Sequence, residues 1–138
     1  MAQEPITVDW TAVSGASPEE VERLAATVQS QLPIEYLDLV AKTNGGEGAL
    51  AVRPGWFQLF DIEFALETWN DSFYRQEFPD YFFFGSNGGL ESFVLVLRGV
   101  NVGSILAVDA IAGVESAFVV ASSFREFTSY IGKPLSEA

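Results

Sequence analysis

Tyr81-Phe82-Phe83-Phe84-Gly85-Ser86-Asn87-Gly88-Gly89, followed after three residues by Phe93-Val94-Leu95-Val96-Leu97, is the stretch that decides the fold. An aromatic run, a glycine-rich turn and an apolar run are typical of a β-hairpin, because glycine adopts the positive φ that a tight turn needs. Five consecutive apolar residues predict that both faces of the second strand are covered. Strands joined by a tight turn run antiparallel, so the stretch predicts an antiparallel sheet.

The residues after this hairpin continue the sheet and end in a helix. Gly99-Val100-Asn101 predicts another turn, and two further strands are expected from Ser104 to Val108 and from Phe118 to Val120. Ser123-Phe124-Arg125-Glu126 has the pattern of a capping box, which predicts a last helix with Phe124, Phe127 and Ile131 facing inward. Gly132 and Pro134 should end it.

The residues before the hairpin predict helices and two short strands. Ser17-Pro18-Glu19-Glu20 is a second capping box, and the apolar residues after it have helical spacing: Val21, Leu24, Ala25, Val28 and Leu32. Pro33 starts a second helix, which Asn44-Gly45 should end as a left-handed C-cap. Strands are expected from Ala49 to Val52 and from Trp56 to Phe60, and Asp61 should cap a short helix that carries Phe64, Ala65, Leu66 and Trp69.

This order of elements predicts one α+β domain over residues 17–138, preceded by a leader over residues 1–16. The sheet should hold about five to six strands, mainly antiparallel or mixed, with flanking helices. The predicted core includes Phe82 to Phe84, Phe93 to Leu97, Phe118, Phe124 and Phe127.

Composition excludes several classes of function. The chain has no Cys and no His, so a disulfide framework, a zinc ribbon, a thiol nucleophile and a histidine base are all ruled out. We therefore expect no metal and no cofactor. Seven basic residues against 19 acidic ones leave a net charge of −12, which argues against direct nucleic-acid binding. The N-terminal residues do not have the pattern of a signal peptide, and no apolar run reaches the length of a membrane span, so the expected location is the cytoplasm, with no membrane partner.

Three motifs resemble signatures of the SUKH superfamily, over roughly residues 18 to 131. The first motif contains Leu32, Pro33 and Tyr36 and ends in Asn44-Gly45-Gly46, the second is the hairpin with Phe84, Gly88 and Gly89, and the third contains Ser123, Phe124 and Phe127. Leu90-Glu91 departs from the small or polar residues of many relatives. The resemblance implies a sheet with flanking helices and no catalytic centre. The founding members are fungal regulators of cell-wall assembly, and most bacterial members look like immunity proteins of contact-dependent and polymorphic toxin systems.

Carboxylates are concentrated between residues 61 and 80, where six acids stand against one base, Arg75. Glu63 and Glu67 lie four residues apart on the expected helix and Asp71 continues their row, an arrangement that costs a few tenths of a kcal/mol by repulsion. Three readings remain open, namely a solvated face, a docking patch for a basic partner, and an acid pair for hydrolysis or metal binding. Exposed aromatic residues beside the acids would anchor a partner. The candidate binding residues are therefore Asp61, Glu63, Glu67, Asp71, Asp80, Trp56, Trp69 and Tyr74.

The function expected from residues and resemblance together is binding rather than catalysis. The leading hypothesis is an immunity protein that occludes a basic toxin domain, such as a nuclease, with its acidic surface. The alternative is a scaffold or regulatory module that binds a protein other than a toxin. A carboxylate-dependent hydrolase is the third hypothesis. The sequence leaves the oligomeric state open.

Overall fold

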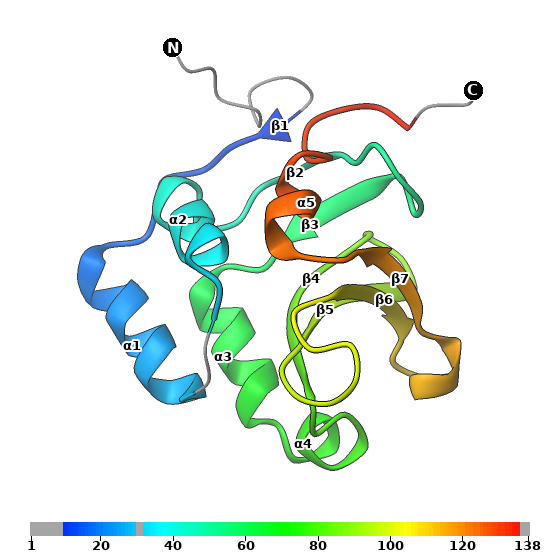
Figure 1. The fold of residues 1–138 in the computed structure, drawn as a ribbon. Helices are drawn as coiled ribbons and strands as arrows, with labels where there is room; N and C mark the ends of the chain where they lie inside the picture. Colours follow the sequence, from blue (N-terminus) through cyan, green and yellow to red (C-terminus); the bar gives the residue numbers. More distant parts are fainter. Residues whose placement is uncertain (1–9, 30–31, 136–138) are drawn as a thin grey trace.

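The computed structural model describes residues 10–29 and 32–135. The expectations for residues 1–9, 30–31 and 136–138 lie outside this part of the chain. Figure 1 shows the first three helices on the left of the molecule, the fourth at the bottom and the last beside the upper strands, with the central strands on the right. In chain order the elements are β1 (Trp10–Thr11), α1 (Pro18–Val28), α2 (Ile34–Lys42), β2 (Glu47–Ala49), β3 (Trp56–Leu59), α3 (Ile62–Asn70), α4 (Ser72–Glu77), β4 (Tyr81–Ser86), β5 (Glu91–Val96), β6 (Ile105–Asp109), η2 (Val114–Ser116), β7 (Phe118–Ala121) and α5 (Phe124–Thr128).

The described strands form one sheet of seven, in the order of the sequence, and each pair is antiparallel. The predicted hairpin is present, with Phe82 opposite Leu95 and a bulge between Phe83 and Gly85. The α+β class is confirmed, whereas the strand number differs from the expected five to six. One extra strand is β1, in which Trp10 pairs with Gly48. Within the described residues, the pairing is antiparallel throughout rather than mixed.

Both faces of the central strands are covered, as the continuous apolar run predicts. Alternate residues point to opposite sides of a strand, and here they divide into two buried clusters. Phe82, Phe84, Phe93, Leu95 and Ile105 pack with α1, α2, α3 and α5 in the larger cluster. The smaller cluster is formed by Phe83, Val94, Val96, Leu106 and Val108, with Phe78 from the end of α4. Two predicted core residues, Leu97 and Phe118, are only partly buried, because each lies at the end of a strand.

The helix starts follow their sequence signals. Ser17 and Glu20 exchange the two hydrogen bonds of a capping box, with distances of 3.1 Å and 2.9 Å. Asp61 caps α3 by accepting from the Phe64 amide at 2.8 Å. The box expected on α5 is half formed: the Ser123 hydroxyl accepts from the Glu126 amide, whereas the Glu126 carboxylate accepts from Ser122 instead of Ser123.

The ends of the elements differ more from expectation. α2 ends without a left-handed cap, since Thr43 is extended. Asn44 instead connects the loop after α2 to the start of α3, where its side-chain oxygen accepts from the Ile62 amide at 2.8 Å. The strand expected to reach Val52 ends at Ala49, because residues 51–54 form a turn.

Candidate functional site

The outer face of α3 carries the predicted acids. α3 buries Ile62, Ala65 and Leu66 against the core, since residues three and four apart share one side of a helix. Glu63 and Glu67 therefore point to solvent, and both are exposed. The structure brings this predicted pair together at one turn's separation, as the spacing indicated.

Asp61 and Asp71 are exposed at the two ends of the same helix. The row does not continue as one helix to Asp71, because α3 ends at Asn70 and a new helix begins at Ser72. Asp71 separates the two helices, and its carboxylate accepts from the Phe73 amide at 2.8 Å. Asp61 and Asp71 thus cap helices while contributing negative charge to the surface.

Two aromatic residues that the sequence did not single out as binding residues lie exposed beside these acids. Phe64 of α3 is 48% exposed and Phe73 of α4 is 47% exposed. Phe64 stacks edge-on against Phe60, with ring centroids 4.6 Å apart. The helical spacing held a signal for Phe64, because it falls off the stripe formed by Ile62, Ala65 and Leu66. We call Glu63, Phe64, Glu67, Asp71 and Phe73 the α3 face.

A shallow hollow of about 280 Å³ lies between α1 and α3. Glu63 and Glu67 line it from α3, and Arg23 lines it from α1. Arg23 reduces the negative potential at this border of the α3 face. The ion pairs Arg98–Asp80 and Arg125–Glu35 involve none of the acids of the α3 face.

Trp56 lies apart from the acidic row, although the sequence placed it beside that row. It sits at the start of β3, roughly 13 Å of strand before the turn into α3 at about 3.3 Å per residue. Its indole N–H donates to Glu47 at 3.0 Å, and the Gln58 amide donates to the same carboxylate oxygen at 2.8 Å. The bonds from Gln58 and from Trp56 lower the pKa of Glu47 below its ordinary value. Trp56 therefore belongs to a polar network on the outer side of β2 and β3.

Three other predicted residues are held by neighbours instead of being free at the surface. Trp69 packs against the core, and the Arg75 guanidinium lies 3.8 Å from its ring centroid. Tyr74 packs against the smaller cluster through Phe83, with centroids 4.8 Å apart. Asp80 pairs with Arg98 at 3.1 Å.

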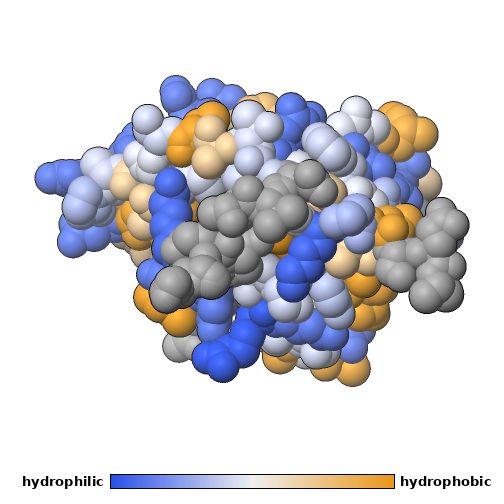
Figure 2. All heavy atoms as spheres, turned by 90° about the horizontal axis from the view of Figure 1, so that it is seen from above, coloured by the Kyte–Doolittle hydropathy of each residue, from blue (hydrophilic) through white to orange (hydrophobic). Residues whose placement is uncertain are grey.

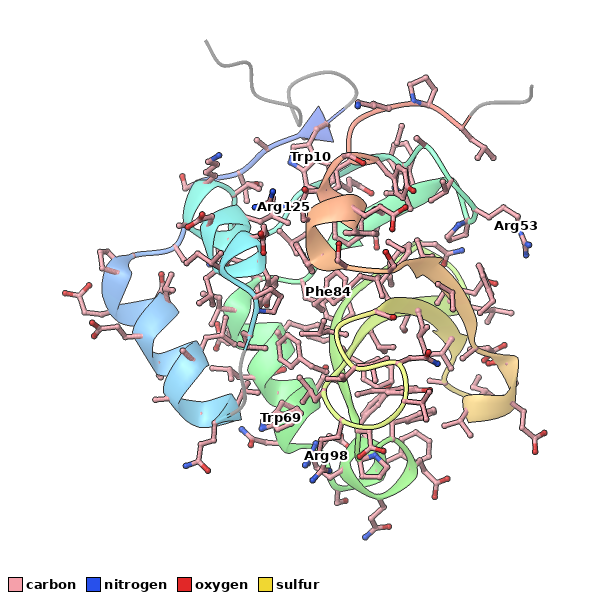
Figure 3. All side chains as sticks on the ribbon, in the orientation of Figure 1. Trp10, Arg53, Trp69, Phe84, Arg98 and Arg125 are labelled. Carbon is pink, nitrogen blue, oxygen red and sulfur yellow. The ribbon has the colours of Figure 1, made fainter. Side chains whose placement is uncertain are left out.

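The residues of the three sequence signatures meet inside the molecule. Tyr36 of the first packs against Phe84 of the second at 5.9 Å and against Phe124 of the third at 5.5 Å. Phe84 also contacts Phe127, with centroids 5.6 Å apart. Phe84 is labelled near the centre of Figure 3. These signature residues are therefore part of the core, whereas Gly88 and Gly89 lie exposed in the hairpin turn.

Comparison with protein families gives a match to the SMI1/KNR4 family (SUKH-1) over residues 15–129, which is most of the chain. The chain belongs to the SMI1/KNR4 family (SUKH-1). This membership confirms the resemblance to the SUKH superfamily found in the sequence. A comparison with curated proteins gave no match.

The SUKH-1 match spans α1 to α5, and β1 lies outside it. Within the described residues of this SUKH-1 chain, no group of three or more Asp or Glu side chains is placed to hold a metal ion. None of the helices described in residues 10–29 and 32–135 has both the length and the apolar character to cross a membrane.

Proposed function

We propose that this SUKH-1 protein is an immunity-type binding protein that neutralises a cognate toxin domain. The observation that carries the proposal is the α3 face, where exposed Glu63, Glu67 and Asp71 stand beside exposed Phe64 and Phe73. Acids with aromatic neighbours form a surface suited to a basic protein partner, because charge guides the encounter and aromatic rings supply contact area. Family membership supports a SUKH domain, and the toxin partner is our inference.

The proposed mechanism is occlusion. A toxin that acts on nucleic acid needs a basic active site, and the acids of the α3 face present negative charge as a phosphate backbone does. Complementary charge raises association rates by about 10- to 10³-fold, and the gain falls as salt is added. Phe64 and Phe73 would then pack against apolar surface of the toxin around its basic site and slow the dissociation of the complex.

Binding is proposed in preference to catalysis because the side chains available for chemistry are few. The chain lacks His and Cys, so a catalytic site would have to use carboxylates. Asp61, Glu63, Glu67 and Asp71 are all exposed to solvent, and two of them cap helices. If the protein were a carboxylate-dependent hydrolase, the double substitution Glu63→Gln and Glu67→Gln would abolish its activity.

The test is co-expression with the toxin encoded beside the gene, together with measurement of complex formation at low salt. Survival of the cells and a complex that weakens with salt are expected. Glu67→Lys should lower the association rate by about tenfold or more. Glu115→Lys is the matched control, because this acid is exposed on η2 and carries the same charge change. Persistent toxicity without a complex would reject the proposal and favour the scaffold or regulatory module.

A further inference from the structure

Two hollows on the surface adjoin at Leu97, the residue that follows β5. The larger, of about 640 Å³, is walled mainly by apolar residues that precede or begin α2 and α5 and by the β5–β6 loop, among them Leu32, Pro33, Val102 and Phe124. The smaller, of about 370 Å³, is lined by Trp69, Arg75 and Arg98. Leu97 lines both hollows, so they are neighbours on the surface, and we call the two together the Leu97 groove. Both volumes fall within the usual range of roughly 300–1,000 Å³ for binding pockets.

The larger part of the groove is apolar and partly open to water. Phe124 is 2% exposed and belongs to its floor, whereas Val102 on the β5–β6 loop is 60% exposed. Val100 on the same loop is 99% exposed, and Ile34, which follows Pro33, is also exposed; both are near in sequence to lining residues and do not line the hollow themselves. Apolar side chains grouped around a hollow in this way mark a surface that a partner can cover.

Arginines line the groove in a chain that has few cations. Only seven of its residues are basic against 19 acidic ones, yet Arg75, Arg98 and Arg125 all line this groove. In Figure 3, Arg98 lies beside Trp69 at the lower end and Arg125 lies higher, on α5, whereas Arg53 projects at the right-hand edge of the view. Glu35 also lines the groove and Asp80 pairs with Arg98, so three arginines stand against two acids there, whereas acids far outnumber bases in the chain as a whole.

The present partners of these arginines orient them and leave capacity for a ligand. The guanidinium carbon of Arg75 lies 3.8 Å from the Trp69 ring centroid, within the range of a cation–π contact. Arg98 donates to Asp80 and to the Pro79 carbonyl, both at 3.1 Å, which fixes it at the lower end. The Arg125–Glu35 contact is 3.5 Å long and Arg125 is 84% exposed, so this pair is weak and readily exchanged.

We propose that the Leu97 groove binds an extended acidic segment of a partner protein. Apolar side chains of the segment lie against Val102 and Phe124, and a carboxylate beyond them reaches Arg98 and Arg75. Charge complementarity selects this occupant, because guanidinium groups pair with carboxylates through two parallel hydrogen bonds. A basic segment would be favoured by the net charge but repelled inside the groove. The inference stands apart from the toxin proposal, which uses the α3 face and a basic partner.

Selection of short random peptides displayed on phage against the full chain tests this inference. The enriched peptides should combine Leu, Ile, Val or Phe with Asp or Glu a few residues away. Each is then synthesised, and its affinity for the full chain is measured by fluorescence anisotropy. The double variant Arg75→Glu with Arg98→Glu should weaken binding by about tenfold or more. Val102→Asp should weaken it similarly from the apolar end, and this exposed loop residue can be changed without disturbing the core.

The control is Arg53→Glu, an exposed arginine away from the groove at the right-hand edge of Figure 3, which undergoes the same substitution with half the charge change of the double variant. It should leave the affinity within about twofold, since net charge contributes little at a distance in physiological salt. The inference is overturned if no peptide is enriched over an unrelated protein, or if the enriched peptides lack acids. It is equally overturned if Arg53→Glu weakens binding as much as the double variant does.

Discussion

Tyr36 shows how one signature residue serves the core at a cost. Its ring is 1% exposed and packs edge-on against Phe82 and Phe124. Its hydroxyl has no hydrogen-bond partner among the described residues, and burial raises the pKa of the phenol. A buried polar group without a partner costs free energy that its removal returns.

Replacing Tyr36 with Phe should therefore leave the protein equally stable, or stabilise it by up to about 1 kcal/mol, because the ring contacts remain and the unpaired hydroxyl is lost. Urea unfolding followed by fluorescence measures the change. Tyr36→Ala is the comparison, and it should lose about 3–5 kcal/mol through the cavity it leaves. A loss above about 1 kcal/mol in Tyr36→Phe would mean that the hydroxyl is hydrogen-bonded.

Thr43 is the opposite case, because its buried hydroxyl has partners on both sides. It accepts from the Val13 amide at 3.1 Å and donates to the Gly45 carbonyl at 2.7 Å. Thr43→Val keeps the shape but leaves two backbone groups unpaired, so we expect a loss of about 1–3 kcal/mol in the free energy of unfolding. Thr27→Val, at an exposed position on α1, should change it by no more than about 0.5 kcal/mol. Equal effects of the two substitutions would contradict this role of Thr43.

At the scale of the element, α5 is stabilised by the Glu126 carboxylate, which accepts hydrogen bonds from a residue before the helix and from one after it. Glu126 accepts from the Ser122 amide at 2.8 Å and from the Tyr130 hydroxyl at 2.7 Å. The Ser122 amide, followed by the Tyr130 and Ser122 hydroxyls, lowers the pKa of Glu126 below its ordinary 4.5. The same bond to Glu126 raises the pKa of Tyr130.

These directions fix the pH dependence expected for Glu126→Gln. A pKa lowered in the folded state stabilises the protein above the unfolded value, and the stabilisation is lost as pH falls through the folded value. The raised pKa of Tyr130 stabilises the protein below about pH 10 and ceases to do so as pH rises through the folded value. The variant should thus be less stable than the wild type near neutrality, and the stabilities of the two proteins should converge in acid below about pH 4.

Thermal unfolding measured across this pH range tests the expected difference in stability. Glu115→Gln serves as control, and a constant gap between Glu126→Gln and the wild type would contradict the assignment.

Elements with local signals could be predicted from the sequence, and elements defined by distant partners could not. The hairpin of β4 and β5 and the starts of α1 and α3 are encoded by turn and capping residues. β1 was not predicted, because a strand of two residues shows no periodicity. It is defined by its pairing with Glu47 and Gly48, which are distant in the sequence. The break between α3 and α4 escaped because Asp71 also fits the four-residue spacing of Glu63 and Glu67.

At the scale of the whole molecule, charge could be predicted and its arrangement only in part. Glu63 and Glu67 could be predicted to share one face of a helix, since residues four apart on a helix are neighbours. The view from above in Figure 2 shows orange, hydrophobic residues in several groups among hydrophilic ones. The arginines of the Leu97 groove come from residues 75, 98 and 125, which only the fold brings together. Trp56 was misplaced for the same reason, because β3 carries it away from α3.

A trade between stability and binding is expected for the α3 face. Glu63 and Glu67 repel each other along α3, and a net charge of −12 adds repulsion across the molecule. Arg23 offsets part of this repulsion at the hollow that both acids line.

Replacing both Glu63 and Glu67 with Gln should raise the free energy of unfolding at low salt by a few tenths of a kcal/mol, and this gain should fade as salt screens the charges. The same double variant should bind a toxin partner more slowly. Urea unfolding at two salt concentrations and association kinetics measure the two effects. If the variant is instead less stable, then Arg23 or another neighbour holds the acids in a structural role and the charge was not placed there for a partner.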